Sequence, residues 1–68
     1  MMALKATIPA REVTQGDWIE TTEISGQVIR VRHARTNRPI AMITVSVESR
    51  GVTRIFDLGD PVTVVLED

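Results

Sequence analysis

The sequence predicts a single all-β domain of five or six short antiparallel strands that bend into a small barrel. Apolar and polar residues alternate repeatedly along the chain, whereas apolar residues at helical spacing are scarce. Turn-forming residues separate the alternating segments at intervals of about 8–12 residues, which is typical of sandwiches and barrels. The chain has 68 residues and no cysteine, so we expect one domain, residues 1–68, that holds together without disulfides.

The expected strands are, in order, residues 4–8, 17–24, 27–33, 41–47, 52–58 and 62–66. Pro9 ends the first strand because it lacks the N–H that a ladder needs. Gly16 supplies the backbone freedom for a tight turn, and Asp17 is expected to hydrogen-bond the backbone just beyond it. Gly26 provides similar freedom at the start of the third strand. Two later turns are expected at Ser49-Arg50-Gly51 and at Leu58-Gly59-Asp60-Pro61.

The third strand is predicted to contain a β-bulge. Val28 and Val31 are three residues apart, so a regular strand cannot point both side chains inward. An extra residue at Ile29-Arg30 allows both to face the core, and bulges are how small barrels make their corners. The full set expected to face inward is Val28, Val31, Ile43, Val45, Val47, Phe56, Val62, Val64 and Leu66.

Trp18 is expected to face outward, because Ile19 beside it is expected to face the core. A large apolar side chain on the surface calls for cover, either from a barrel rim or from a binding partner. Trp18 is therefore the candidate partner-binding residue.

The order of these motifs resembles the SH3-like or Sm-like superfamily of small barrels. It runs apolar-x-x-Gly-Asp-x-apolar from Val13, Gly-x-Val-x-x-Val from Gly26, a long alternating strand, a glycine turn, and a closing Val-x-Val. The segment from Gly16 to Val28 is particularly similar to KOW-type domains and to the β-domain of small mechanosensitive channels. The resemblance implies an SH3-like antiparallel barrel. It implies no single function, because these families include RNA binders, ribosome partners, channel modules and protein-interaction domains.

Two features depart from these families. The membrane segments of the channel proteins are missing from the sequence, and one Trp, one Phe and no Tyr cannot build the aromatic groove of a true SH3 domain. The resemblance therefore concerns the barrel fold, and it implies neither a membrane channel nor the ligand groove of a true SH3 domain.

Charge is segregated along the sequence, although the net charge is only −1. Between Glu23 and Glu48 there is no acidic residue, and the flanking segments are acidic. The candidate nucleic-acid-binding residues lie in this stretch: Arg30, Arg32, His33, Arg35 and Arg38. Arg30 and Arg32 share strand parity and are expected on the outer face, with Arg35 and Arg38 at the following hairpin tip. Guanidinium groups favour bidentate contacts with phosphate or carboxylate.

Two alternatives remain for these arginines. They can pair with the acidic strands beside them as a solvated surface network, or they can bind an acidic protein surface. The first hypothesis for the whole protein is phosphate-backbone binding of nucleic acid. The alternative is a protein-interaction or assembly module, such as a small phage or bacterial adaptor or a particle component.

We expect no enzymatic activity and no cofactor or metal. The chain has no cysteine nucleophile, and its one histidine has no recognisable orienting partner. Asp57 and Asp60 are close enough in sequence to be considered as a pair of catalytic carboxylates, but the segment Leu58-Gly59-Asp60-Pro61 is typical of a turn. No phosphate-loop or dinucleotide-binding pattern occurs.

A cytoplasmic location without membrane partners is expected, because an apolar run such as residues 40–43 is far shorter than the ~20 residues of a span. Self-association through a strand edge is also expected. The strand that begins at Ile40 has no charged residue before Glu48 to discourage edge pairing.

Overall fold

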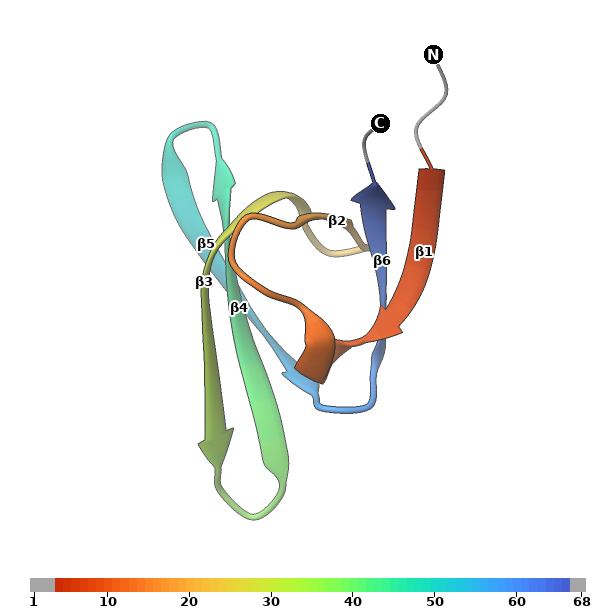
Figure 1. Cartoon of the computed structure of the whole chain (residues 1–68). Helices are drawn as coiled ribbons and strands as arrows, with labels where there is room; N and C mark the ends of the chain where they lie inside the picture. The colour runs from red at the N-terminus through yellow and green to blue at the C-terminus, as the bar shows by residue number, and fades with distance from the viewer. Residues whose placement is uncertain (1–3, 67–68) are drawn as a thin grey trace.

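The computed structural model describes residues 4–66 and forms one antiparallel sheet of six strands (Figure 1). The elements are β1 (Leu4–Pro9), the 3-10 turn η1 (Ala10–Glu12), β2 (Trp18–Glu20), β3 (Ser25–Arg35), β4 (Pro39–Val47), β5 (Arg50–Asp57) and β6 (Pro61–Leu66). Their order across the sheet is β1-β6-β2-β3-β4-β5. The predicted all-β class is confirmed, and the hydrogen-bonded ladder leaves β1 and β5 as the two edges of the bent sheet.

The predicted bulge in β3 is confirmed. The register between β3 and β4 shifts between Val28 and Arg30. Val28 lies opposite Val45 before the shift, and Val31 lies opposite Ile43 after it. Both valines therefore belong to the core face, with Val28 buried and Val31 partly buried. The bulge also determines which face the following arginines occupy.

The core lies between the two halves of the bent sheet. Its buried side chains are Ala10, Val13, Ile19, Ile24, Val28, Ala41, Ile43, Val45, Val62 and Val64. Val31, Val47 and Phe56 are partly buried and pack against this cluster. The prediction for Leu66 was wrong, since its side chain is 47% exposed. The pairing of β6 with β2 ends at Val65 opposite Trp18, so β2 does not extend far enough to cover Leu66.

One predicted strand is shorter than expected, and one predicted turn is displaced. The expected extended segment 17–24 contains only the short strand β2, because Thr21 and Ile24 close a turn in which the Thr21 N–H donates to the Ile24 carbonyl at 2.8 Å. The turn expected at Ser49–Gly51 lies instead at Glu48-Ser49, where φ is 50° and 66°. Gly51 is a strand residue of β5.

Asp17 makes its turn contact in the opposite direction from the predicted one. Its Oδ2 accepts a hydrogen bond from the Thr14 N–H at 3.0 Å, and the Asp17 N–H donates back to the Thr14 carbonyl at 3.1 Å. The carboxylate therefore closes the loop that precedes it. Gly16 sits in this loop with φ of 99°, a conformation that favours glycine.

The expected edge for self-association was wrong, because the strand beginning at Ile40 is interior. β4 pairs with β3 on one side and with β5 on the other. No helix in the described residues 4–66 is long and apolar enough to cross a membrane.

Candidate nucleic-acid interface

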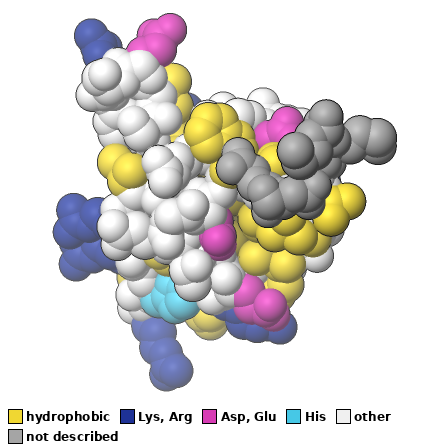
Figure 2. Space-filling view, turned by 45° about the horizontal axis from the view of Figure 1, so that its top comes forward, with side chains coloured by type: hydrophobic (Ala, Val, Ile, Leu, Met, Phe, Trp, Pro, Cys, Tyr) yellow, Lys and Arg dark blue, Asp and Glu magenta, His cyan; other side chains and the backbone are white. Residues whose placement is uncertain are grey.

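Positive charge is concentrated in the three-stranded meander β3-β4-β5. Residues 25–57 contain six arginines and His33 but only two acids, Glu48 and Asp57. The other described residues contain Lys5 and Arg11 against five acids. Figure 2 shows Lys and Arg side chains projecting from the margin of the molecule. The charge blocks of the sequence thus become two oppositely charged halves of the fold.

Arg30 and Arg32 lie together on the outer face of the meander, as predicted. Arg30 is opposite Thr44 in β4, and Arg32 is opposite Met42. The two arginines line a shallow hollow of about 190 Å³ with Met42, Thr44 and Thr53. The Thr44 and Thr53 hydroxyl oxygens are 2.7 Å apart. Guanidinium groups beside hydroxyl donors are the groups that commonly contact phosphate oxygens.

The ion pairs formed by the described residues leave this hollow uncompensated. They join Lys5 to Glu20 at 3.0 Å and Arg38 to Asp57 at 3.0 Å. Neither pair includes Arg30 or Arg32, so both guanidinium groups are available to a ligand.

His33 and Arg35 occupy the opposite face of β3 from Arg30 and Arg32. His33 is opposite the core residue Ala41, and Arg35 is opposite Pro39 at the end of the strand. Both side chains are exposed, and Figure 1 shows the tip of the β3–β4 hairpin reaching beyond the other strands. The fold therefore distributes the predicted cluster over two faces of one hairpin.

Arg38 pairs with an acid of its own chain. Its Nε is 3.0 Å from Asp57 Oδ1, at the end of β5. The hairpin tip around it is held by the Thr36 hydroxyl, which donates to the Arg38 carbonyl at 3.1 Å. The internal pairing considered as an alternative from the sequence thus occurs at Arg38, and among residues 4–66 it involves none of the other three arginines.

Trp18 faces outward as predicted, with its side chain 48% exposed. It is opposite Gln27 in β3 and Val65 in β6. Ile29 and Ile55 are also largely exposed, at 43% and 61%. These three side chains are the main apolar features of the surface around the meander.

Sequence reasoning missed the threonine pair and Arg54. Thr44 and Thr53 are opposite one another in β4 and β5, which becomes visible only when the turn is placed at Glu48-Ser49. Arg54 is exposed, and its Nη1 donates to the Thr53 carbonyl at 3.0 Å. The sequence did offer a signal for Thr44, because it occupies an outward position in the alternating pattern of β4.

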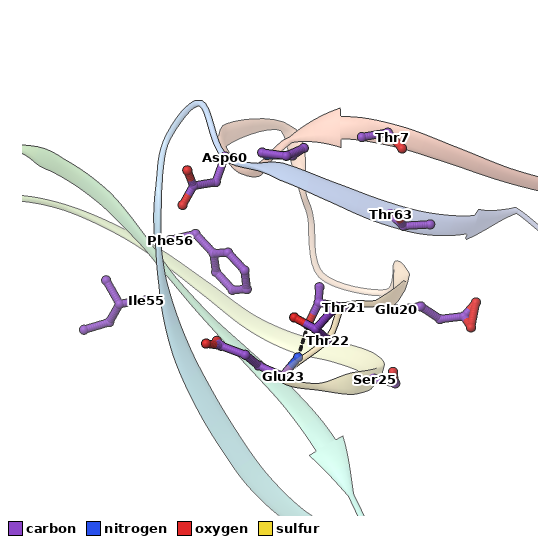
Figure 3. Close-up of a pocket in the computed structure, with 11 residues that line it drawn as sticks. Thr7, Glu20, Thr21, Thr22, Glu23, Ser25, Ile55, Phe56, Asp60 and Thr63 are labelled. Carbon is purple, nitrogen blue, oxygen red and sulfur yellow. Dashed lines mark hydrogen bonds between the residues drawn. The ribbon is translucent and has the colours of Figure 1, made fainter.

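A larger hollow lies elsewhere, between the β2–β3 turn, the end of β5 and the start of β6. Its volume is about 750 Å³, and it is lined by Thr7, Glu20, Thr21, Thr22, Glu23, Ser25, Ile55, Phe56, Asp60, Pro61 and Thr63. Figure 3 shows the Phe56 ring directed into this hollow and Ile55 directed away from it. Its three carboxylates make it unfavourable for a phosphate, so it is not a second candidate for nucleic acid.

The described residues contain no group of three or more His, Cys, Asp or Glu side chains placed to hold a metal ion. No protein-family model, curated protein or solved structure matches the chain. The fold and the site therefore define a class only: a small antiparallel β protein with a segregated arginine-rich surface.

Proposed function

We propose that this protein is a non-enzymatic binding module of the SH3-like barrel superfamily that contacts the phosphate backbone of nucleic acid through the meander β3-β4-β5. The topology supports the barrel assignment, because β2 pairs with both β3 and β6 while β3, β4 and β5 form a meander. The observation that carries the function is the outer-face hollow, where Arg30 and Arg32 flank hydroxyl groups and have no ion-pair partner among the described residues.

In the proposed complex, the hairpin of β3 and β4 lies along the backbone and contacts phosphates from both of its faces. Arg30 and Arg32 act from one face, and Arg35 with His33 acts from the other. The hairpin is two-stranded only beyond Ile40, where the pairing of β4 with β5 ends, and a two-stranded β-ribbon fits the major groove of duplex DNA. Phosphate contacts position a protein without reading bases. We therefore expect binding with little dependence on sequence.

Salt-dependent binding to duplex DNA, single-stranded DNA and structured RNA tests this proposal. The double variant Arg30→Ala/Arg32→Ala should bind more weakly and flatten the log–log salt dependence by about one for each arginine removed. The matched control is Arg11→Ala, an exposed arginine of η1 in the acidic half, which should leave the slope unchanged. Absence of binding to all three nucleic acids at low salt, where attraction is strongest, would contradict the proposal.

A second candidate is a protein-interaction or assembly module for an acidic protein surface. The outward Trp18 favours it, because tryptophan and arginine are the residues most enriched at the centres of protein interfaces. Trp18→Ala should then abolish capture of the partner protein and leave any nucleic-acid binding intact. If nucleic-acid binding is absent and Trp18→Ala removes a specific partner, this second function replaces the first.

A further inference from the structure

Within the described residues 4–66, strand β5 is a free edge of the sheet. It pairs with β4 on one side, and it is the last strand in the sheet order on the other. It is eight residues long, whereas the opposite edge, β1, has six and ends in a proline that cannot donate to a ladder. An unpaired edge of this length offers a row of N–H and C=O groups to another strand.

The turn between β4 and β5 shows which of these groups are available. A two-residue turn at Glu48-Ser49 makes the flanking residues Val47 and Arg50 a hydrogen-bonded pair. Backbone groups alternate along a strand, so those of Arg50, Val52, Arg54 and Phe56 point toward β4. Those of Gly51, Thr53 and Ile55 point toward the open edge. The Thr53 carbonyl also accepts a hydrogen bond from Arg54 Nη1 at 3.0 Å, and its second lone pair remains for a strand on this edge. Asp57 agrees with this parity, because its N–H is directed away from β4 and donates to Asp60 Oδ2 at 2.9 Å.

We propose that β5 pairs antiparallel with β5 of a second copy of this chain, with Thr53 opposite Thr53 of the second copy. In this register, Gly51 of each copy faces Ile55 of the other, and every pair uses backbone groups that point to the open edge. Each of these residue pairs exchanges two hydrogen bonds. The dimer has two-fold symmetry, which is the commonest closed arrangement of identical chains.

Charge favours this register over its neighbours. With Thr53 at the centre, Val52 lies opposite Arg54 of the second copy, and no two arginines are opposed. Moving the centre to Arg54 places the two Arg54 guanidinium groups directly opposite, which is destabilising. Moving it to Ile55 requires the Asp57 N–H, which already donates to Asp60.

The side chains on the outer face are complementary in the same register. Ile29 lies over Gly51, because a Cβ at residue 51 would be 3.8 Å from Ile29 Cδ1. Ile55 of the second copy is opposite Gly51 on that face and therefore meets Ile29. Ile55 is 61% exposed and Ile29 is 43% exposed in the single chain. Dimerisation covers both, which supplies apolar burial that a chain of this size lacks.

Sedimentation over micromolar to submillimolar concentrations, without nucleic acid, tests the dimer independently of the proposed function. The native chain should form a dimer, and Ile55→Lys should remain a monomer over the same range. Leu4→Lys is the matched control, because Leu4 is an equally exposed apolar residue, 59%, on the other edge strand. It should leave the dimer intact. A monomeric native chain, or loss of the dimer in Leu4→Lys, overturns the proposal.

Cysteine cross-linking tests the register. The chain has no cysteine, so Thr53→Cys introduces a unique thiol at the proposed two-fold axis. The Cβ atoms of a hydrogen-bonded antiparallel pair are about 5.5 Å apart, too far for a relaxed disulfide but within reach of a short bifunctional thiol reagent. Thr53→Cys should cross-link with such a reagent, and Ile55→Cys should not, because it faces Gly51 rather than itself. Cross-linking of Ile55→Cys, or its absence in Thr53→Cys, overturns the register.

Discussion

Gly26 lies against the backbone of Ser46 so closely that a Cβ at residue 26 would be 2.7 Å from the Ser46 carbonyl oxygen. At this point β3 leaves its pairing with β2, which covers Ser25–Gln27, and continues along β4 from Gln27. The glycine has φ of 153° and is buried between neighbouring strands. The sharp bend of the sheet therefore depends on the absence of a side chain here.

We predict that Gly26→Ala destabilises the fold by about 1–3 kcal/mol, because the new methyl group meets backbone that cannot rotate away. Urea unfolding followed by circular dichroism measures the effect. Gly59→Ala is the control, since a Cβ there meets nothing within 4 Å. It should change stability by no more than about 0.5 kcal/mol. Equal effects of the two variants would show that the contact with Ser46 is unimportant.

The turn between β4 and β5 offers a stabilising change. Ser49 has φ of 66°, a left-handed conformation that costs an L-residue about 1 kcal/mol and glycine almost nothing. Ser49→Gly should raise the free energy of unfolding by about 0.5–1 kcal/mol. Asn37→Gly, in the turn between β3 and β4, is the control. Asn37 has no positive φ, so this change should give no gain, and a gain equal to that of Ser49→Gly would contradict the explanation.

The core should respond to truncation in the order of burial. Ile43 is fully buried at the centre of β4, so Ile43→Ala should cost about 2–5 kcal/mol. Leu66→Ala removes a side chain that is 47% exposed beyond the end of β2, and it should cost less than about 1 kcal/mol. Thermal unfolding of the two variants compares them directly. A larger loss for Leu66→Ala would mean that its apolar surface is covered in solution.

The Arg38–Asp57 pair gives a prediction that joins stability to the proposed function. Asp57→Asn removes the acidic partner and should lower stability by less than about 1 kcal/mol, because the Arg38 and Asp57 side chains are 72% and 46% exposed, although the paired Oδ1 atom is itself shielded. It frees Arg38, so the log–log salt slope of nucleic-acid binding should steepen by about one. Glu12 of η1 has no ion-pair partner among the described residues, so the control Glu12→Gln should leave the slope unchanged. An unchanged slope in Asp57→Asn would mean that Arg38 does not contact phosphate.

Local pattern was sufficient to predict most of the strands, the bulge at Ile29-Arg30 and the outward position of Trp18. These features depend on the alternation of side chains between the two faces of one strand, which is set by residues that are adjacent in sequence. The spacing of Val28 and Val31 predicts the bulge directly, because only an extra residue brings both to one face. The parity of Arg30 and Arg32 follows from the same reasoning.

Strand order, edges and cross-strand neighbours required the folded chain. Nothing in the residues of β4 distinguishes an interior strand from an edge, so its position between β3 and β5 was missed. Leu66 has the parity of a core residue, yet β2 is too short to cover it. The Thr44–Thr53 contact and the Arg38–Asp57 pair join residues from different strands. Such contacts depend on register and on the length of neighbouring strands, which arise from pairing between distant segments rather than from the alternation within any one of them.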